Sequence, residues 1–164
     1  MVNILDKVQP KNKMQLKQLV DYAFKHDIYD LNFIDTSEIT DMSKLFMSCD
    51  YNFDVSSWDV SNVTDMNHMF YDCDNFNCDL SKWNVSKVVN MFSTFSSCKK
   101  FKGKGLENWD VSAVTDMHYM FYECENLNCD LSDWDVSFVS DFGWIFYRCD
   151  KMTIPNWYKL YHKK

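Results

Sequence analysis

Residues 54–86 read DVSSWDVSNVTDMNHMFYDCDNFNCDLSKWNVS, and the end of this stretch repeats its beginning. Trp58 and Val60 are followed 25 residues later by Trp83 and Val85. Extending this register in both directions divides residues 31–154 into five units of about 25 residues, called units 1 to 5 below. A fixed period of this length is typical of repeat proteins, in which each unit buries its apolar side chains against its neighbours.

Three positions hold nearly the same side chain in every unit. The Trp position comprises Ile34, Trp58, Trp83, Trp109 and Trp134. The Phe position comprises Phe46, Phe70, Phe95, Phe121 and Phe146. The Cys position comprises Cys49, Cys73, Cys98, Cys124 and Cys149. A buried aromatic ring removes about 150–250 Å² from water, so we expect the Trp and Phe positions to form the core and set the register.

The spacing of apolar residues changes halfway through each unit. Trp58 and Val60 alternate with polar residues, which is typical of a short strand with one buried face. Met66 and Phe70 then follow at helical spacing, after Asp65 at a position that suits a helix N-terminus. The sequence therefore predicts an α/β repeat solenoid resembling a leucine-rich repeat, with one short parallel strand and one short helix per unit.

The two ends of the chain depart from the repeat. Residues 11–26 place apolar side chains, Met14 among them, near one helical stripe, so residues 1–30 are expected to form an N-terminal helical cap. Residues 31–157 would contain the five units and a truncated sixth strand at 154–157. Residues 158–164 would form a basic C-terminal tail.

Composition limits the classes of partner and the compartment. A formal net charge of −7 disfavours non-specific binding to nucleic acid or to anionic membranes. Seven cysteines, an odd number, argue against a closed disulfide framework and favour a reducing compartment. The N-terminal residues do not resemble a signal peptide, and no stretch is apolar enough to span a membrane. We expect a cytoplasmic protein, in the host cytoplasm if virus-encoded.

The motif W-D-V-S-x-V-T-D-M-x-x-M-F-x-x-C, read at residues 58–73, resembles the BspA-like repeat family. That family includes the repeats of unknown function found in mycoplasma surface lipoproteins, and the similarity extends from residue 31 to about 154. The resemblance implies a leucine-rich-repeat-like fold and a role in recognition or adhesion, with no catalytic residues to transfer. Many relatives carry export signals and this chain shows none, which favours an intracellular or virus-encoded binder.

The polar residues do not form a recognisable catalytic or metal-binding pattern. His26, His68 and His118 are not spaced as a ligand set, so neither an enzyme nor a cofactor is expected. Cys78 and Cys129 are separated by a whole repeat, too far apart to share one zinc ion. The recurring Asp and Ser residues near the Trp position are expected to bond the backbone of turns rather than calcium.

The positions that vary between units are free to carry recognition. Bulky amphipathic side chains occupy two of them, at Tyr71, Tyr119, Tyr122, Trp144 and Tyr147. Tyr and Trp dominate protein interfaces, although these residues could instead fill gaps between units. Unit 3 has Ser93 and Ser96 there, so the patch should be interrupted. The secondary candidate is a basic stretch, Lys99, Lys100, Lys102 and Lys104, which could dock an acidic partner or simply be solvated.

The sequence therefore predicts a non-enzymatic protein–protein interaction module of unknown partner. Two alternatives remain open at this point. One is a surface or virion-attached adhesive repeat protein, and the other is an acidic decoy for a basic or nucleic-acid-binding protein.

Overall fold

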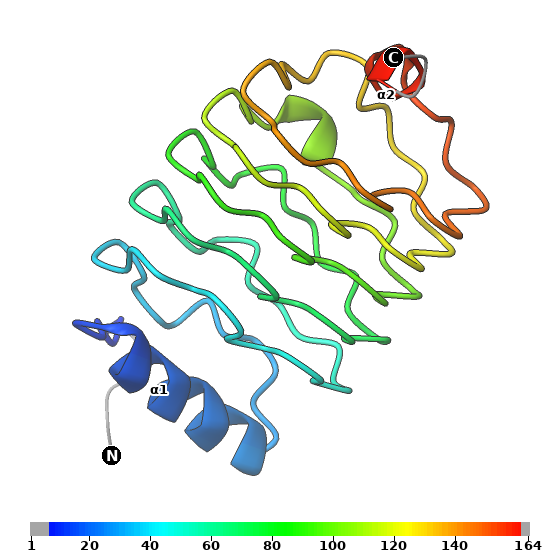
Figure 1. The fold of residues 1–164 in the computed structure, drawn as a ribbon. Coiled ribbons are helices and arrows are strands. Elements are labelled where there is room, and N and C mark those ends of the chain that lie inside the picture. The colour runs from blue at the N-terminus through cyan, green and yellow to red at the C-terminus, as the bar shows by residue number, and fades with distance from the viewer. Residues whose placement is uncertain (1–6, 162–164) are drawn as a thin grey trace.

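The computed structural model describes residues 7–161 and stacks the repeat units side by side between two terminal helices (Figure 1). Helix α1 spans Lys13–Lys25 at one end of the stack, and helix α2 spans Asn156–Tyr161 at the other. The only other helical element in this range is the 3-10 helix η1, Leu106–Asn108. No helix in the described part of the chain is long and apolar enough to cross a membrane.

The prediction of one strand and one helix per unit is wrong. Within residues 7–161 the β pairing is limited to isolated parallel bridges, and no sheet forms. One row of these bridges crosses every junction between units, through Asp41, Asp65, Asn90, Asp116 and Asp141. The described units also contain no α-helix. The chain is therefore not an α/β solenoid of the leucine-rich-repeat kind, and its units are built from consecutive turns.

Residues 42–49, the turn segment of unit 1, show why helical spacing produces no helix. The N–H of Leu45 donates to the Met42 carbonyl 3.3 Å away and closes a tight turn. The N–H groups of Lys44 and Phe46 donate instead to carbonyls of unit 2, each at 2.9 Å. An α-helix needs every N–H to bond four residues back, so alternate donation to the next unit excludes it.

The equivalent turn segments are residues 66–73, 91–98, 117–124 and 142–149. Two positions in each turn segment have a positive φ, between 51° and 61°: Lys44, Ser48, His68, Asp72, Ser93, Ser97, Tyr119, Glu123, Trp144 and Arg148. A turn with positive φ at its third residue ordinarily has Gly or Asn there, and neither is present. The hydrogen bonds between units therefore hold the backbone in a conformation that its side chains disfavour.

Rows of aromatic rings fill the space between the turn segments and the Trp position. Neighbouring rings of the Phe position lie 5.3–5.9 Å apart between centroids and within 5–7° of parallel. The four Trp side chains from Trp58 to Trp134 are at most 5% exposed, which confirms their predicted burial. A second row, Phe53, Phe76 and Phe101, stacks against the first and was not predicted.

Side-chain donors also link each unit to the unit before it. The indole Nε1–H of Trp58 donates to the Leu31 carbonyl at 2.9 Å, and the Trp residues of the later units repeat this bond. The Cys98 thiol donates to the Phe70 carbonyl at 2.9 Å. Equivalent thiol bonds at 2.9–3.0 Å recur at Cys73, Cys124 and Cys149. The Cys position therefore supplies hydrogen-bond donors to the core.

The recurring acidic residues bond the backbone of turns, as the sequence predicted. Asp59 Oδ1 accepts the N–H of Ser61 at 2.9 Å, and the corresponding Asp residues of later units do the same. Asp65, which resembled a residue at a helix N-terminus, accepts the N–H of Asn67 at 2.8 Å. Such side-chain bonds two residues forward define Asx turns.

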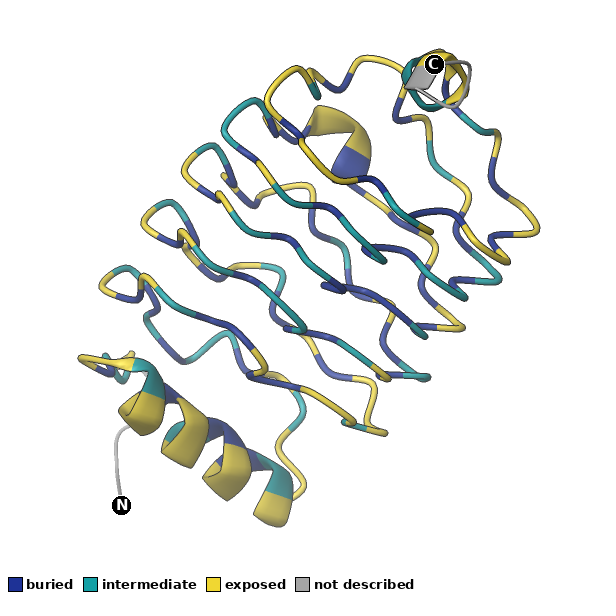
Figure 2. Ribbon diagram, in the orientation of Figure 1, coloured by how far each residue is buried: buried dark blue, intermediate teal, exposed yellow. Residues whose placement is uncertain are grey.

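Helix α1 covers the first unit through one face. Asn12 caps its N-terminus by accepting the N–H of Gln15 at 3.0 Å. Leu16, Val20 and Ala23 are buried against the stack on the inner face of the helix (Figure 2). Met14 was expected on this face but is 65% exposed.

The C-terminal end differs from the predicted truncated strand. Helix α2 begins at Asn156, and its Trp157 donates from Nε1 to the Leu131 carbonyl at 2.8 Å. Trp157 therefore continues the row of Trp bonds from a helix. Residues 158–161 of the predicted basic tail belong to α2, and residues 162–164 lie outside the described range.

Ser48 provides a test of the positive φ. Removing its Cβ should relieve about 1–2 kcal/mol of strain, which exceeds the roughly 0.5–1 kcal/mol that glycine adds in backbone entropy. Ser48→Gly should therefore raise the free energy of unfolding in urea by up to about 1 kcal/mol. The matched control Ser61→Gly, where φ is not positive, should lower it by a similar amount. Equal destabilisation by both changes would contradict the turn geometry.

The buried thiols make the free energy of unfolding depend on pH in the alkaline range. Burial raises the pKa of Cys73 and of Cys149 from the ordinary value of 9.0 to about 12. Between those values the unfolded chain loses thiol protons that the folded chain keeps. The stabilisation is therefore complete below about pH 9 and is lost progressively as the pH rises toward 12.

The double variant Cys73→Ser/Cys149→Ser tests this dependence, because serine keeps a donor but does not ionise in this range. Above pH 9 the wild-type free energy of unfolding should fall more steeply, by roughly 1.4 kcal/mol per pH unit for each thiol removed. Urea titrations between pH 8 and 10.5 measure both slopes. Identical slopes would show that these thiols are accessible to solvent.

Candidate functional site

The five aromatic residues singled out from the sequence line one hollow of about 490 Å³. The complete lining is Tyr71, Ser93, Ser96, Tyr119, Tyr122, Trp144 and Tyr147. These residues come from four consecutive units. In each turn segment they occupy one of two positions, the first positive-φ residue or the residue after the Phe position. The hollow is thus a product of the stacking, and no single unit contains it.

The turn geometry directs these side chains outward. Tyr119 lies at the first positive-φ position of unit 4, with φ of 56°. Tyr122 follows the core residue Phe121, and its N–H donates to the Tyr119 carbonyl at 3.1 Å. Phe121 is fully buried whereas both tyrosines are partly exposed. Trp144 and Tyr147 repeat the arrangement in unit 5, where they are 53% and 43% exposed.

The rings pack against one another in two orientations. Tyr119 and Tyr122 meet nearly at right angles, 82°, with centroids 5.4 Å apart. Trp144 and Tyr147 do the same at 78° and 5.2 Å. Tyr122 and Tyr147 are stacked 5.0 Å apart and join the two pairs. These aromatic residues therefore pack against one another across units and also border a hollow, and their role in binding a partner stays a prediction.

Ser93 and Ser96 make the hollow. The sequence suggested that these small residues would divide the aromatic patch at unit 3. They are instead only 4% and 3% exposed and lie in the lining, between Tyr71 on one side and the rings of units 4 and 5 on the other. Their missing side-chain volume leaves a recess where units 2, 4 and 5 have tyrosine.

The aromatic surface extends beyond the predicted residues. Phe92 lies 4.9 Å from the His68 ring and 6.2 Å from the Tyr119 ring, measured between centroids. It also stacks on His118 at 5.8 Å. Phe92 and His118 could have been identified from their place in the repeat. They occupy equivalent positions, each directly before the first positive-φ residue of a turn segment.

Charged groups near the hollow are mostly acidic or paired. Arg148 Nη1 lies 3.2 Å from Glu123 Oε1, so its charge is balanced. His118 Nδ1 lies 2.8 Å from Asp141 Oδ2. The Gly143 N–H and His118 together lower the pKa of Asp141. Burial, followed by the nearby Glu123 carboxylate, raises the pKa of Tyr122, so this phenol stays neutral over a wide pH range.

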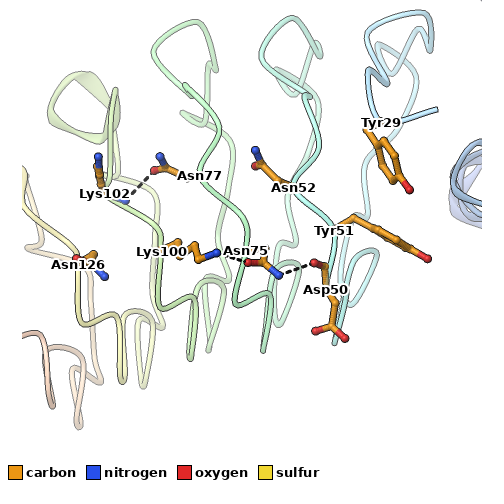
Figure 3. A pocket seen from close by; sticks show the side chains of 9 residues that line it. All are labelled: Tyr29, Asp50, Tyr51, Asn52, Asn75, Asn77, Lys100, Lys102 and Asn126. Atoms are coloured by element: carbon orange, nitrogen blue, oxygen red, sulfur yellow. Dashed lines mark hydrogen bonds between the residues drawn. The ribbon is translucent and has the colours of Figure 1, made fainter. Parts of the chain in front are cut away.

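A larger hollow, of about 620 Å³, lies along the loops that follow the Cys position. Its lining is Tyr29, Asp50, Tyr51, Asn52, Asn75, Asn77, Lys100, Lys102 and Asn126 (Figure 3). Asn75 Nδ2 donates to the Asp50 carbonyl at 2.7 Å, and Lys100 Nζ donates to Asn75 Oδ1 at 2.6 Å. These polar groups bond one another from unit to unit, so the smaller aromatic hollow is the better candidate for a ligand.

The basic stretch of unit 3 is bonded to unit 2. Lys99 pairs with Asp74 at 2.9 Å, and Lys104 pairs with Asp79 at 2.6 Å. The Lys104 ammonium holds the pKa of Asp79 at about 2. The charges of these two lysines are therefore balanced within the protein, whereas Lys100 donates to the neutral amide oxygen of Asn75.

The positions of the cysteines and of the potential metal-ligating side chains complete the description of the polar groups. No group of His, Cys, Asp and Glu side chains between residues 7 and 161 could hold a metal ion. All seven cysteines are free thiols. Cys78 is only 8% exposed, whereas Cys49 and Cys129 are partly exposed.

Comparison with known proteins identifies a family for almost the whole chain. A family model described as "Mycoplasma protein of unknown function, DUF285" matches residues 14–105 and 95–159. The resemblance to mycoplasma repeats is confirmed at this level, and a leucine-rich repeat is not. No curated protein and no solved structure matches the chain.

Proposed function

Since the chain belongs to the DUF285 family, whose function is unknown, we propose from its own geometry that it is a non-enzymatic module that binds another protein. The aromatic hollow is the binding site. The observation that supports this most directly is a recess of about 490 Å³ bordered by four tyrosines and one tryptophan from three units and by two serines of a fourth. Tyr and Trp are the residues that contribute most to protein interfaces, and recesses lined by them accept side chains of a partner.

The positions of these rings support a role beyond packing. Trp144 and Tyr147 keep about half of their surface exposed although both carry large apolar rings. An exposed aromatic cluster of this kind adds little to stability and favours association with another surface. The core depends instead on the fully buried Phe position, so the hollow can change without changing the fold.

Filling the hollow tests the proposal with little risk to the fold. Ser96→Tyr restores the residue that units 2, 4 and 5 carry at the same position, and stacking at 5.0 Å between Tyr122 and Tyr147 shows that neighbouring units accept it. Proteins captured from the cell of origin by the wild type should be lost with this variant. The partner so identified, once purified, should bind the variant at least about tenfold more weakly by calorimetry.

A second variant and a control complete the experiment. Tyr119→Ser/Trp144→Ser introduces the serine that unit 3 carries at that position and should also abolish binding. Phe138→Ser changes a residue that is 70% exposed and outside the hollow, so it should bind normally. Normal binding by both hollow variants, with unchanged thermal unfolding, would refute the proposal.

A further inference from the structure

The rings of the hollow are arranged to contact a compact group from more than one side. The Tyr119–Tyr122 and Trp144–Tyr147 pairs are each close to perpendicular, at 82° and 78°. Aromatic faces carry partial negative charge, and a cation within about 6 Å of a ring centroid is attracted to them. Perpendicular rings suit a compact ammonium, which can be approached from several directions. A planar guanidinium is better matched by parallel stacking on one ring.

Acidic residues lie near the lining residues in the sequence of units 2, 4 and 5, whereas unit 3 has Asn90 and Ser97 at the equivalent positions. They occupy the position just before the turn segment, at Asp65, Asp116 and Asp141, or its second positive-φ position, at Asp72 and Glu123. The lining itself contains no cationic side chain. Arg148, the cation closest in sequence, is paired with Glu123. With a net charge of −7 for the chain, an anionic group would be repelled from this surface.

Two histidines near the hollow do not reverse this charge balance at neutral pH. His118 is paired with the Asp141 carboxylate at 2.8 Å. Burial, followed by repulsion from Lys44, lowers the pKa of His68, so this ring is neutral at pH 7. The local surface therefore combines aromatic faces with an excess of carboxylates, which together favour a cationic ligand.

We infer that the hollow receives the side-chain ammonium of a lysine on a basic segment of the partner. This inference rests on the proposed function, because it names the chemistry by which that same hollow recognises a protein. The alkyl stem of the lysine packs on the rings, and its head lies over an aromatic face, where the carboxylate of Asp72, next to Tyr71 in the sequence, adds to the attraction.

Three synthetic peptides that differ only at their central residue provide the test. The probes are acetyl-Gly-Gly-X-Gly-Gly-amide, in which X is lysine, trimethyllysine or norleucine, and the protein is the full chain. Aromatic proton shifts in NMR titrations report binding at the hollow. Lysine and trimethyllysine should each bind roughly 3- to 30-fold more tightly than norleucine, the range expected for a cation over aromatic faces.

Variants separate the contribution of the rings from that of the charges. Tyr119→Ser/Trp144→Ser should lose the preference for the charged peptides, because two of the rings are gone. Asp72→Asn keeps every ring and the Arg148–Glu123 pair, and it should weaken the charged peptides several-fold while leaving norleucine unchanged. Phe138→Ser, outside the hollow, should behave as the wild type.

The outcomes distinguish this inference from the proposed function. If norleucine binds as tightly as lysine, the hollow is an apolar site and the inference is wrong, although the partner can still bind there. If none of the peptides shifts the hollow resonances, the inference is equally wrong. If the Ser96→Tyr variant binds the purified partner normally, the proposed function itself fails.

Discussion

The hydrogen bonds between neighbouring turn segments determine the rest of this structure. In each turn segment alternate N–H groups donate to the following unit, as Met66, His68, Phe70 and Asp72 do at 2.8–3.0 Å. The intervening N–H groups close turns within their own unit. The backbone can satisfy both sets only by adopting a positive φ at every fourth residue, which excludes a helix and a strand alike. At the N-terminal end of the stack, Lys13 of α1 bonds the side chains of Asp41 and Ser43.

Side-chain bonds run in the opposite direction across the same junctions. The Trp Nε1–H and the Cys thiol both donate to carbonyls of the preceding unit, while the turn-segment N–H groups donate to the following unit. Each junction is therefore tied from both sides, and a shift of one unit would break both sets of bonds. This explains why the Cys position holds a cysteine: a thiol is apolar enough for a fully buried site and still offers a proton to a carbonyl. The row of cysteines therefore contributes directly to the hydrogen bonding between units.

The sequence predicted composition-dependent features well and backbone geometry poorly. The repeat register, the burial of the Trp and Phe positions and the helix now seen at Lys13–Lys25 all follow from which residue types recur and at what spacing. The predictions of a strand and a helix in each unit were wrong. Residues at i, i+3 and i+4 lie on one face of a helix, but they also lie on one face of consecutive turns. Positive φ at Lys44, Tyr119 and Trp144 could not be read from residue types that ordinarily avoid it.

The residues of the hollow were predictable because they vary between units. The effect of Ser93 and Ser96 was not, since a missing side chain becomes a recess only when its neighbours are placed.

The separation between the invariant rows and the variable positions has a functional consequence. The Phe, Trp and Cys positions satisfy the core and its hydrogen bonds, and the Asp residues satisfy the turns, so none of them is free to change. The first positive-φ position and the residue after the Phe position are at least partly exposed in every unit except unit 3, where Ser93 and Ser96 are buried. Tyrosine, tryptophan and serine therefore occupy equivalent positions on the same backbone. The shape of the recess is decided by which units carry a small residue, and its depth here follows from two serines between larger neighbours. The shape of the recess thus depends on the pattern of side-chain volume along the stack, while stability depends on the ladder beneath it.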